Sequence, residues 1–302
     1  TPPHPYCDMY DAADIPPPLP QEDVRDKPPQ YLRAREGHPY GGYNTHKGWS
    51  GDHYREIVAH YYGLTTFIDH SIGRVLEALD RLGLVENTHV VFTSDHGEGL
   101  CDHGIAAKPM MSYECVNRVP MLWRHPGMVE PGSTYEGVMT HLDLTPTFID
   151  LAGAEPLPGM EGRSFSGVLR GETATHRDAV IVERITVLPP VRDETEEMIL
   201  RVKMLVTDTW KLLHYGSAPY GELYDVENDP EDMHNLWDDP AYGEVKRDLC
   251  DRLLHELIDS ELGDPTIILK SRGMGGALRD MRQMENQPET RTELHKQIGR
   301  MD

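Results

Sequence analysis

The chain has 302 residues, of which 38% are hydrophobic and 26% charged, which is typical of globular domains and long enough for a large and a smaller domain. Its 51 acidic and 29 basic residues give a formal net charge of −22, which argues against nucleic acid or an anionic membrane as partner, because both require clustered Lys and Arg. No run of about 18 apolar residues occurs, so we expect no transmembrane helix. The four cysteines form no C-x-x-C pair, which argues against a disulfide scaffold and a thiolate zinc site.

The N-terminal region, residues 1–50, is rich in Pro, Gly, Tyr and His, and its proline runs exclude a long helix or a central strand. We expect an ordered loop wrapped over a domain, or a linker. Residues 51–82 then repeat apolar residues at spacings of three and four, which predicts one long helix that ends at Gly83. The apolar positions are Ile57, Tyr61, Leu64, Ile68, Ile72, Val75 and Leu79.

A short buried strand is predicted at residues 89–94, and its end carries Asp95 and His96. A second short strand is predicted at 119–123, and a helix at 143–152. Strands that alternate with helices indicate an α/β domain. In open α/β sheets, binding sites lie beyond the carboxyl ends of strands, which is where Asp95 falls.

The composition changes near Gly171, and strand signals dominate after it. We therefore assign residues 1–172 to a large α/β domain. Residues 173–262 are assigned to a small α+β subdomain, with a predicted hairpin and an amphipathic helix over 241–259. Residues 263–302 are polar and contain several glycines, so they are expected to form a tail and are a candidate arm for homo-oligomerisation.

Asp95 and His96 are the predicted metal ligands, because adjacent side chains can converge where a strand turns into a loop. A carboxylate suits Ca²⁺, Mg²⁺ or Mn²⁺, while an imidazole also favours transition metals. Lys108 is predicted to stabilise charge on a bound sulfuryl or phosphoryl group, with a solvated surface lysine as the alternative. His103 is predicted to donate to the same anion, with packing inside the loop as the alternative.

No residue of the chain is recognisable as a nucleophile. There is no G-x-S-x-G motif, which excludes an α/β-hydrolase elbow, and no P-loop or Rossmann glycine pattern. Cys115 and Arg118 are the nearest approach to a Cys–Arg motif, but the arginine comes one residue too early and the proline is absent. Since the chain begins Thr1-Pro2-Pro3 rather than with Met, we expect it to start within a larger protein.

Several segments together resemble the sulfatases of the alkaline phosphatase superfamily. Residues 90–120 resemble that family's strand ending T-S-D-H/N-G-E, its glycine-rich loop with a lysine, and its R-V/I-P strand. Residues 54–82 resemble a long helix of the family, and residues 140–147 resemble its H-x-D-x-x-P-T segment. Residues 222–236 resemble its ending E-L-Y-D-L-x-x-D-P-x-E-x-x-N-L. The resemblance covers most of residues 1–260.

The resemblance implies the C-terminal part of an alkaline-phosphatase-like α/β sandwich domain, plus a small α+β subdomain with an antiparallel sheet. It implies a sulfuric ester hydrolase whose divalent metal, Ca²⁺ first with Mn²⁺ or Mg²⁺ as alternatives, is held by Asp95, His96 and two acidic residues near the family's N-terminus. The nucleophile is a formylglycine made from the cysteine of C-x-P-x-R, and Lys108 matches the lysine that contacts sulfate. Residues 1–302 lack that motif, so the nucleophile is expected upstream and this chain alone is expected to be inactive.

Two alternatives stay open. A phosphonate monoester hydrolase or phosphodiesterase of the same architecture is compatible with the same Asp–His pair. The alternative outside the enzymes is a non-catalytic metal-binding or interaction module, which requires the chain to be complete as it stands. We expect a small-molecule sulfate or phosphate ester as partner and a cytoplasmic location, with the periplasm as the alternative.

Overall fold

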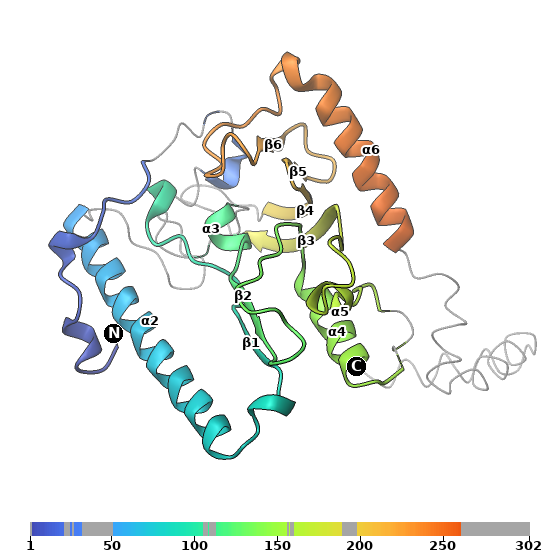
Figure 1. The fold of residues 1–302 in the computed structure, drawn as a ribbon. Coiled ribbons are helices and arrows are strands. Elements are labelled where there is room, and N and C mark those ends of the chain that lie inside the picture. Colours follow the sequence, from blue (N-terminus) through green and yellow to red (C-terminus); the bar gives the residue numbers. More distant parts are fainter. Residues whose placement is uncertain are drawn as a thin grey trace, which may run out of the picture. The chain divides into compact units, whose positions relative to one another are not determined.

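The computed structural model describes residues 2–20, 25, 27–31, 51–104, 108, 113–155, 157, 160–188 and 198–260. Contacts group the chain into two units, one formed by Thr1–Met139 with Gly167–Leu253 and the other by Thr140–Ser166 with Leu254–Asp302. Figure 1 gives the elements. The predicted tail lies outside the described residues, and the predicted domain boundary near residue 172 stays a prediction. Among the described residues, no helix is long and apolar enough to cross a bilayer.

Helix α2 spans Gly51–Arg81, one residue shorter than the predicted 51–82. Gly83 follows it with a φ of +66°, which glycine adopts without strain. The Gly83 amide donates to the Asp80 carbonyl at 2.9 Å and the Leu84 amide to the Leu79 carbonyl at 2.9 Å. This pair of bonds defines a Schellman motif, so the prediction that Gly83 ends the helix is confirmed.

Residues 2–20 of the N-terminal region form an ordered segment whose two turns pack along α2. It contains two 3-10 turns, η1 (Tyr6–Asp8) and η2 (Ala12–Asp14). The Tyr6 hydroxyl lies 3.0 Å from Nδ1 of His70, and the backbone carbonyl of Tyr6 fills the space beside Gly63, where a Cβ would approach its oxygen to 2.1 Å. Of the two expectations for this region, the ordered loop is therefore the correct one for these residues.

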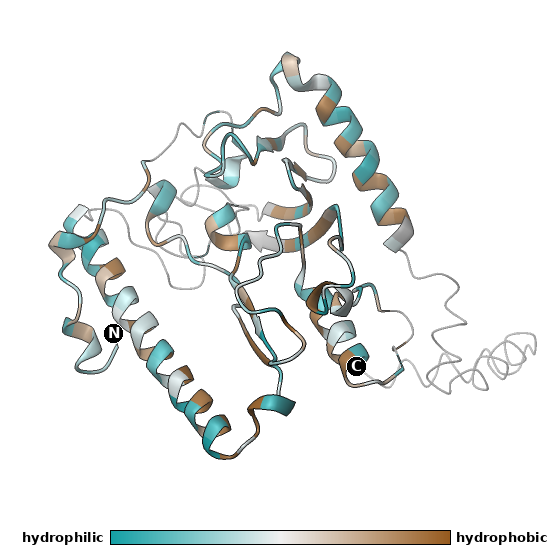
Figure 2. Cartoon of the chain, viewed as in Figure 1, coloured by the Kyte–Doolittle hydropathy of each residue, from teal (hydrophilic) through white to brown (hydrophobic). Residues whose placement is uncertain are grey.

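The predicted apolar stripe of α2 is largely exposed. Only Ala59 and Gly63 are buried on this helix, whereas Ile68 is 45% and Val75 59% exposed. Figure 2 shows hydrophobic positions recurring along α2. An uncovered apolar stripe of this length is typical of a surface that another polypeptide covers.

Strands β1 (Val90–Thr93) and β2 (Met121–Arg124) form a two-stranded antiparallel sheet, in which Val90 faces Arg124 and Thr93 faces Met121. Both predicted strands exist, but the prediction that they are buried is wrong for these residues, since Phe92 is 36% and Leu122 65% exposed. The second begins later than the predicted residue 119, because Pro120 has no amide hydrogen for the ladder. Antiparallel pairing places the end of β1 beside the start of β2, and Asp95 and His96 follow that end.

The second sheet has four antiparallel strands in the order β3-β4-β5-β6. Their bounds are Ala179–Leu188, Met198–Thr207, Trp210–His214 and Gly221–Asp225. The predicted hairpin joins β4 to β5, and the Thr207 hydroxyl accepts the Trp210 amide at 2.9 Å to close its turn. Helix α6 follows at Gly243–Ser260, near the predicted 241–259. The core of this sheet consists of Leu200, Val202, Met204, Leu213, Tyr215 and Tyr224.

In the other unit, helix α4 spans Leu144–Leu151 after the turn η6 (His141–Asp143), inside the predicted 143–152. The Asp143 carboxylate is fully buried and accepts the Arg163 amide at 2.8 Å. The buried Thr147 hydroxyl donates to the Asp143 carbonyl at 2.6 Å and accepts the Phe165 amide at 3.0 Å. The aspartate and threonine of the H-x-D-x-x-P-T segment therefore hold the chain of residues 163–165.

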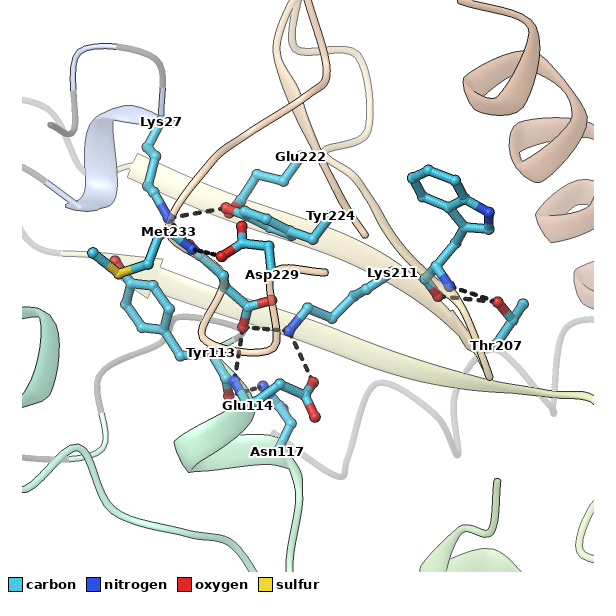
Figure 3. Close-up of polar contacts among 12 residues, drawn as sticks. Lys27, Tyr113, Glu114, Asn117, Thr207, Lys211, Glu222, Tyr224, Asp229 and Met233 are labelled. Carbon is cyan, nitrogen blue, oxygen red and sulfur yellow. Dashed lines mark hydrogen bonds and ion pairs between the residues drawn. The ribbon is translucent and has the colours of Figure 1, made fainter. Parts of the chain in front are cut away.

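A buried ionic cluster joins the short helix α3 (Glu114–Asn117) to the four-stranded sheet (Figure 3). Lys211 on β5 is 0% exposed, and its Nζ donates to Oε1 of Glu114 at 2.9 Å and to Oδ2 of Asp232 at 2.5 Å. Asp232 also accepts the Glu114 amide at 2.9 Å. Lys27 donates to the Asp232 carbonyl at 2.6 Å. These bonds fix α3 against β5.

The charges in this cluster depend on one another. Burial raises the pKa of Asp232 to about 6, although Lys211 acts in the opposite direction. Burial also disfavours the charge of Lys211, but Asp232 and Glu114 outweigh it and raise the pKa of the Lys211 ammonium. The positive charge of Lys211 therefore offsets the cost of burying the carboxylates of Glu114 and Asp232.

Candidate active site

Asp95 and His96 lie in the turn that follows β1. The Asp95 side chain is 84% exposed and that of His96 36% exposed. The His96 amide donates to Oδ1 of Asp95 at 3.0 Å, and the Ser94 hydroxyl donates to the His96 carbonyl at 2.8 Å. These local bonds fold the turn so that the two adjacent side chains point the same way, as predicted for a strand end.

The two imidazole nitrogens of His96 have different surroundings: Nδ1 is hydrogen-bonded to backbone, and Nε2 faces Asp95 and Lys108. Nδ1 lies 2.9 Å from the Gly97 carbonyl, which can only accept, so we assign the proton to Nδ1. Nε2 then carries the lone pair. It lies 3.4 Å from Oδ2 of Asp95 and 2.8 Å from Nζ of Lys108. The structure thus brings together the three residues predicted as metal ligands and as the anion-binding lysine.

Gly97 anchors this turn to α3. Its amide donates to the Val116 carbonyl at 2.8 Å. A Cβ at position 97 would lie 1.9 Å from the Cys115 carbonyl oxygen, which is a collision with backbone. Only glycine fits here, so the turn that carries His96 rests directly on the helix held by the buried ionic cluster.

We expect Gly97→Ala to lower the free energy of unfolding by about 1–3 kcal/mol, because the new methyl group must push α3 away. The matched control is Gly73→Ala on α2, where a Cβ meets nothing within 4 Å. That change should stabilise the protein by about 0.5–1 kcal/mol, because alanine favours a helix interior. Midpoints of urea unfolding measure both variants. Equal effects of the two changes would contradict the close contact at Gly97.

The charges around the turn suit a cation. The pKa of Asp95 is lowered, first by the hydrogen bond from the His96 amide and further by the positive charge of Lys108, so its carboxylate is ionised. Burial raises the pKa of Glu98, and the positive charge of Lys108 counteracts this shift. Oε1 of Glu98 is buried and has no hydrogen-bond partner among the described residues.

A divalent metal fits these residues. Oδ2 of Asp95 and Nε2 of His96 are an ionised oxygen and a nitrogen lone pair 3.4 Å apart, and Glu98 places an unsatisfied acceptor nearby. Ca²⁺, Mn²⁺ and Mg²⁺ each take more ligands than these, so further ligands must come from other residues or water.

His103 has a different environment. It is 1% exposed, has a φ of +56°, and stacks on Tyr113 with ring centroids 3.7 Å apart. Within the described part of the chain, its ring contact is with Tyr113 rather than with Asp95, His96 or Lys108. Burial and stacking favour the packing alternative, while its role in substrate binding stays a prediction.

Comparison with known proteins then identifies the family. The sulfatase family model matches residues 3–154, and a model described as N-sulphoglucosamine sulphohydrolase, C-terminal, matches residues 101–259. The chain belongs to the sulfatase family, which confirms the resemblance predicted from the motifs.

Individual relatives agree with this assignment. N-acetylglucosamine-6-O-sulfatase of Bacteroides thetaiotaomicron is 30% identical over an alignment of 238 residues that covers 77% of this chain and 40% of that protein. The phosphonate monoester hydrolase of Silicibacter pomeroyi superposes with a TM-score of 0.76 at 25% identity, covering 88% of this chain and 54% of that one. A protein solved with its substrate D-glucosamine-2-N,6-O-disulfate gives a TM-score of 0.62 at 29% identity, covering 71% of this chain and 43% of that one.

These superpositions confirm the predicted fold class, a mixed α/β architecture of the alkaline-phosphatase-like sulfatases with antiparallel sheets. The chain spans 40% to 54% of the length of the three proteins compared.

Proposed function

We propose that residues 1–302 belong to the catalytic unit of a metal-dependent hydrolase of sulfate esters. The observation that carries this proposal is the convergence of Asp95, His96 and Lys108 at the end of β1, in a chain of the sulfatase family. Sulfatases depend on a metal and a formylglycine nucleophile. Because residues 1–302 contain no C-x-P-x-R motif, we assign the nucleophile to further polypeptide.

Two features support the contribution of further polypeptide. The chain corresponds to 40% of the B. thetaiotaomicron sulfatase, and the apolar stripe of α2 is exposed. We use the term complete catalytic unit for residues 1–302 together with the polypeptide, continuous or separate, that carries the nucleophile.

In the complete catalytic unit, Asp95 and His96 would hold the metal, which we propose to be Ca²⁺, with Mn²⁺ and Mg²⁺ as alternatives. A bound divalent cation supplies Lewis acidity at a substrate oxygen. Nε2 of His96 has one lone pair, so Lys108 can donate to it only while no cation occupies it. When a cation is bound to Nε2, the Lys108 ammonium would instead stabilise charge on the sulfuryl group or the leaving oxygen.

The substrate, assembly and location complete the proposal. We propose a small-molecule sulfate ester as substrate, by analogy with the disulfated glucosamine bound by the solved relative. Homo-oligomerisation through residues 263–302 and a cytoplasmic location remain proposals from the sequence alone.

A second candidate is a phosphonate monoester hydrolase. The TM-score of 0.76 to the S. pomeroyi enzyme favours it, since the Asp–His pair serves either ester. The kcat/KM values of the complete catalytic unit for an aryl sulfate and an aryl phosphonate monoester separate the two candidates. We expect the aryl sulfate to have the higher kcat/KM. Preference for the phosphonate would establish the second candidate, and turnover of neither would favour a non-catalytic module.

Metal removal gives a further expected result. Dialysis of the complete catalytic unit against a chelator should abolish aryl sulfate hydrolysis, because Asp95 and His96 then hold no cation. Added Ca²⁺ should restore it, and Mn²⁺ and Mg²⁺ are tested in parallel to identify the metal. Full activity in a chelated sample that retains less than about a tenth of an equivalent of metal would contradict the proposed metal site.

A further inference from the structure

The N-terminal segment carries a second group of side chains with metal-ligand chemistry, on and beside η1. The group consists of His4, Cys7 and Asp8, whose ligand atoms all lie within 4.8 Å of one another. Nδ1 of His4 is 2.7 Å from Oδ2 of Asp8 and 3.3 Å from Sγ of Cys7. Among the residues described, no other set of three His, Cys, Asp or Glu side chains is this close.

The backbone brings these side chains to one side of a single turn. The Cys7 amide donates to the Pro3 carbonyl at 3.3 Å, and the Asp8 amide donates to the Pro5 carbonyl at 3.2 Å. Residues three and four positions apart lie on the same face of such a turn, which is the spacing of His4 to Cys7 and to Asp8. Tyr6 fastens the turn to α2 through its contact with His70.

We propose that His4, Cys7 and Asp8 form a surface binding site for a transition-metal dication of the Zn²⁺ class. An imidazole nitrogen, a thiolate and a carboxylate are the ligand types that Zn²⁺ takes, and the soft sulfur selects against Ca²⁺ and Mg²⁺. The His4 side chain is 82% and the Asp8 side chain 67% exposed, so a cation and a water ligand reach the site from solvent. Three protein ligands with an open fourth position make the site exchangeable.

The sequence pattern does not predict this site, because the recognised thiolate motifs for metals contain paired cysteines. Here one cysteine combines with a histidine three positions before it and an aspartate directly after it. The site shares no residue with the Asp95–His96 pair, and its sulfur ligand gives it a different metal preference.

Metal binding to this group requires loss of the Cys7 proton. The dication replaces this proton on Sγ, and the proton passes to solvent.

Co²⁺ is the probe that tests the site, because a thiolate ligand to Co²⁺ gives a sulfur-to-cobalt charge-transfer absorption in the near ultraviolet. Titration of the purified protein with Co²⁺ should give a saturable band of this kind, displaced by Zn²⁺. Cys7→Ser should remove the band, whereas Cys250→Ser, at a half-buried cysteine of α6, should keep it. Asp8→Asn should weaken Co²⁺ binding by about 10-fold or more, while Asp14→Asn on η2 should leave it unchanged.

Absence of the charge-transfer band in the unaltered protein would overturn the site, and so would a band that survives Cys7→Ser. The Asp95–His96 pair contains no sulfur, so cobalt bound there gives no such band. Failure of the catalytic proposal therefore leaves this test intact, and failure here leaves the catalytic proposal intact.

Discussion

Replacement of Lys108 by alanine is expected to lower the turnover of an aryl sulfate by about 10²–10³-fold in the complete catalytic unit, the usual cost of removing one donor to a developing negative charge. Nζ of Lys108 lies 2.8 Å from Nε2 of His96, so its charge lies beside a proposed metal ligand. The side chain is exposed, so the free energy of unfolding should change little.

Two controls make the Lys108 result specific. Lys203→Ala removes an exposed lysine of β4 that pairs with Glu183, and turnover should be unaffected. Lys108→Arg keeps the charge but changes its shape, so turnover should fall less than in the alanine variant. Unchanged turnover in Lys108→Ala would remove this residue from the site and favour the solvated-lysine alternative.

Replacement of Lys211 by methionine is expected to lower the free energy of unfolding by about 3–5 kcal/mol, because it leaves a buried carboxylate without its cation. Asp232 is 1% exposed, and the remaining partner of its Oδ2 is the Glu114 amide. Methionine has similar length and is apolar, so the loss reflects the charge rather than a cavity. The urea midpoint and its slope measure the change.

Lys203→Met is the matched control for this experiment. Lys203 lies on the adjacent strand, and its ion pair with Glu183 is 39% and 54% exposed, so we expect a loss below about 1 kcal/mol. A loss of similar size in the two variants would contradict the assignment of the cluster around Lys211 as a buried, mutually dependent set.

The pH dependence of the Lys211→Met defect follows from Asp232. Burial raises the folded-state pKa of Asp232 to about 6, so the stability that this group contributes is fully present below about pH 4 and is lost as the pH rises through 6. Without Lys211 that pKa rises further. The defect of the variant should therefore be largest above pH 6 and shrink as acid protonates Asp232. A pH-independent defect would contradict this account.

Local patterns predicted the elements and where the proposed metal ligands Asp95 and His96 lie in the chain. Helix α2 is recognisable from its apolar period and from Gly83, and β1 from a short apolar run that ends at Asp95. These signals concern residues adjacent in sequence. The fold class followed from the family motifs, whereas the antiparallel pairing of β1 with β2 required the structure.

Long-range interactions could not be predicted in this way. The ionic cluster unites Lys27, Glu114, Lys211 and Asp232, and no local pattern links residues so far apart in the sequence. No local pattern predicts the burial of His103 against Tyr113 either. The apolar period of α2 predicted a helix correctly, but it could not say that the stripe would remain exposed within this chain.

These contacts form one structural path to the site. Lys211 of the sheet binds Glu114 of α3, and the Val116 carbonyl of α3 accepts the Gly97 amide. The Gly97 carbonyl in turn accepts a hydrogen bond from Nδ1 of His96. The orientation of Nε2 in His96 therefore depends on packing well away from it, and changes in the buried cluster should reach the proposed metal ligands.

The metal content of the complete catalytic unit, measured with and without Asp95→Asn and His96→Ala, tests the proposed metal site. The measurement belongs in a Cys7→Ser background, so that the proposed surface site contributes no metal. We expect about one equivalent of divalent metal in the parent, and loss of both metal and aryl sulfate turnover in each variant. Retention of a full equivalent and of turnover in either variant would contradict the proposed site.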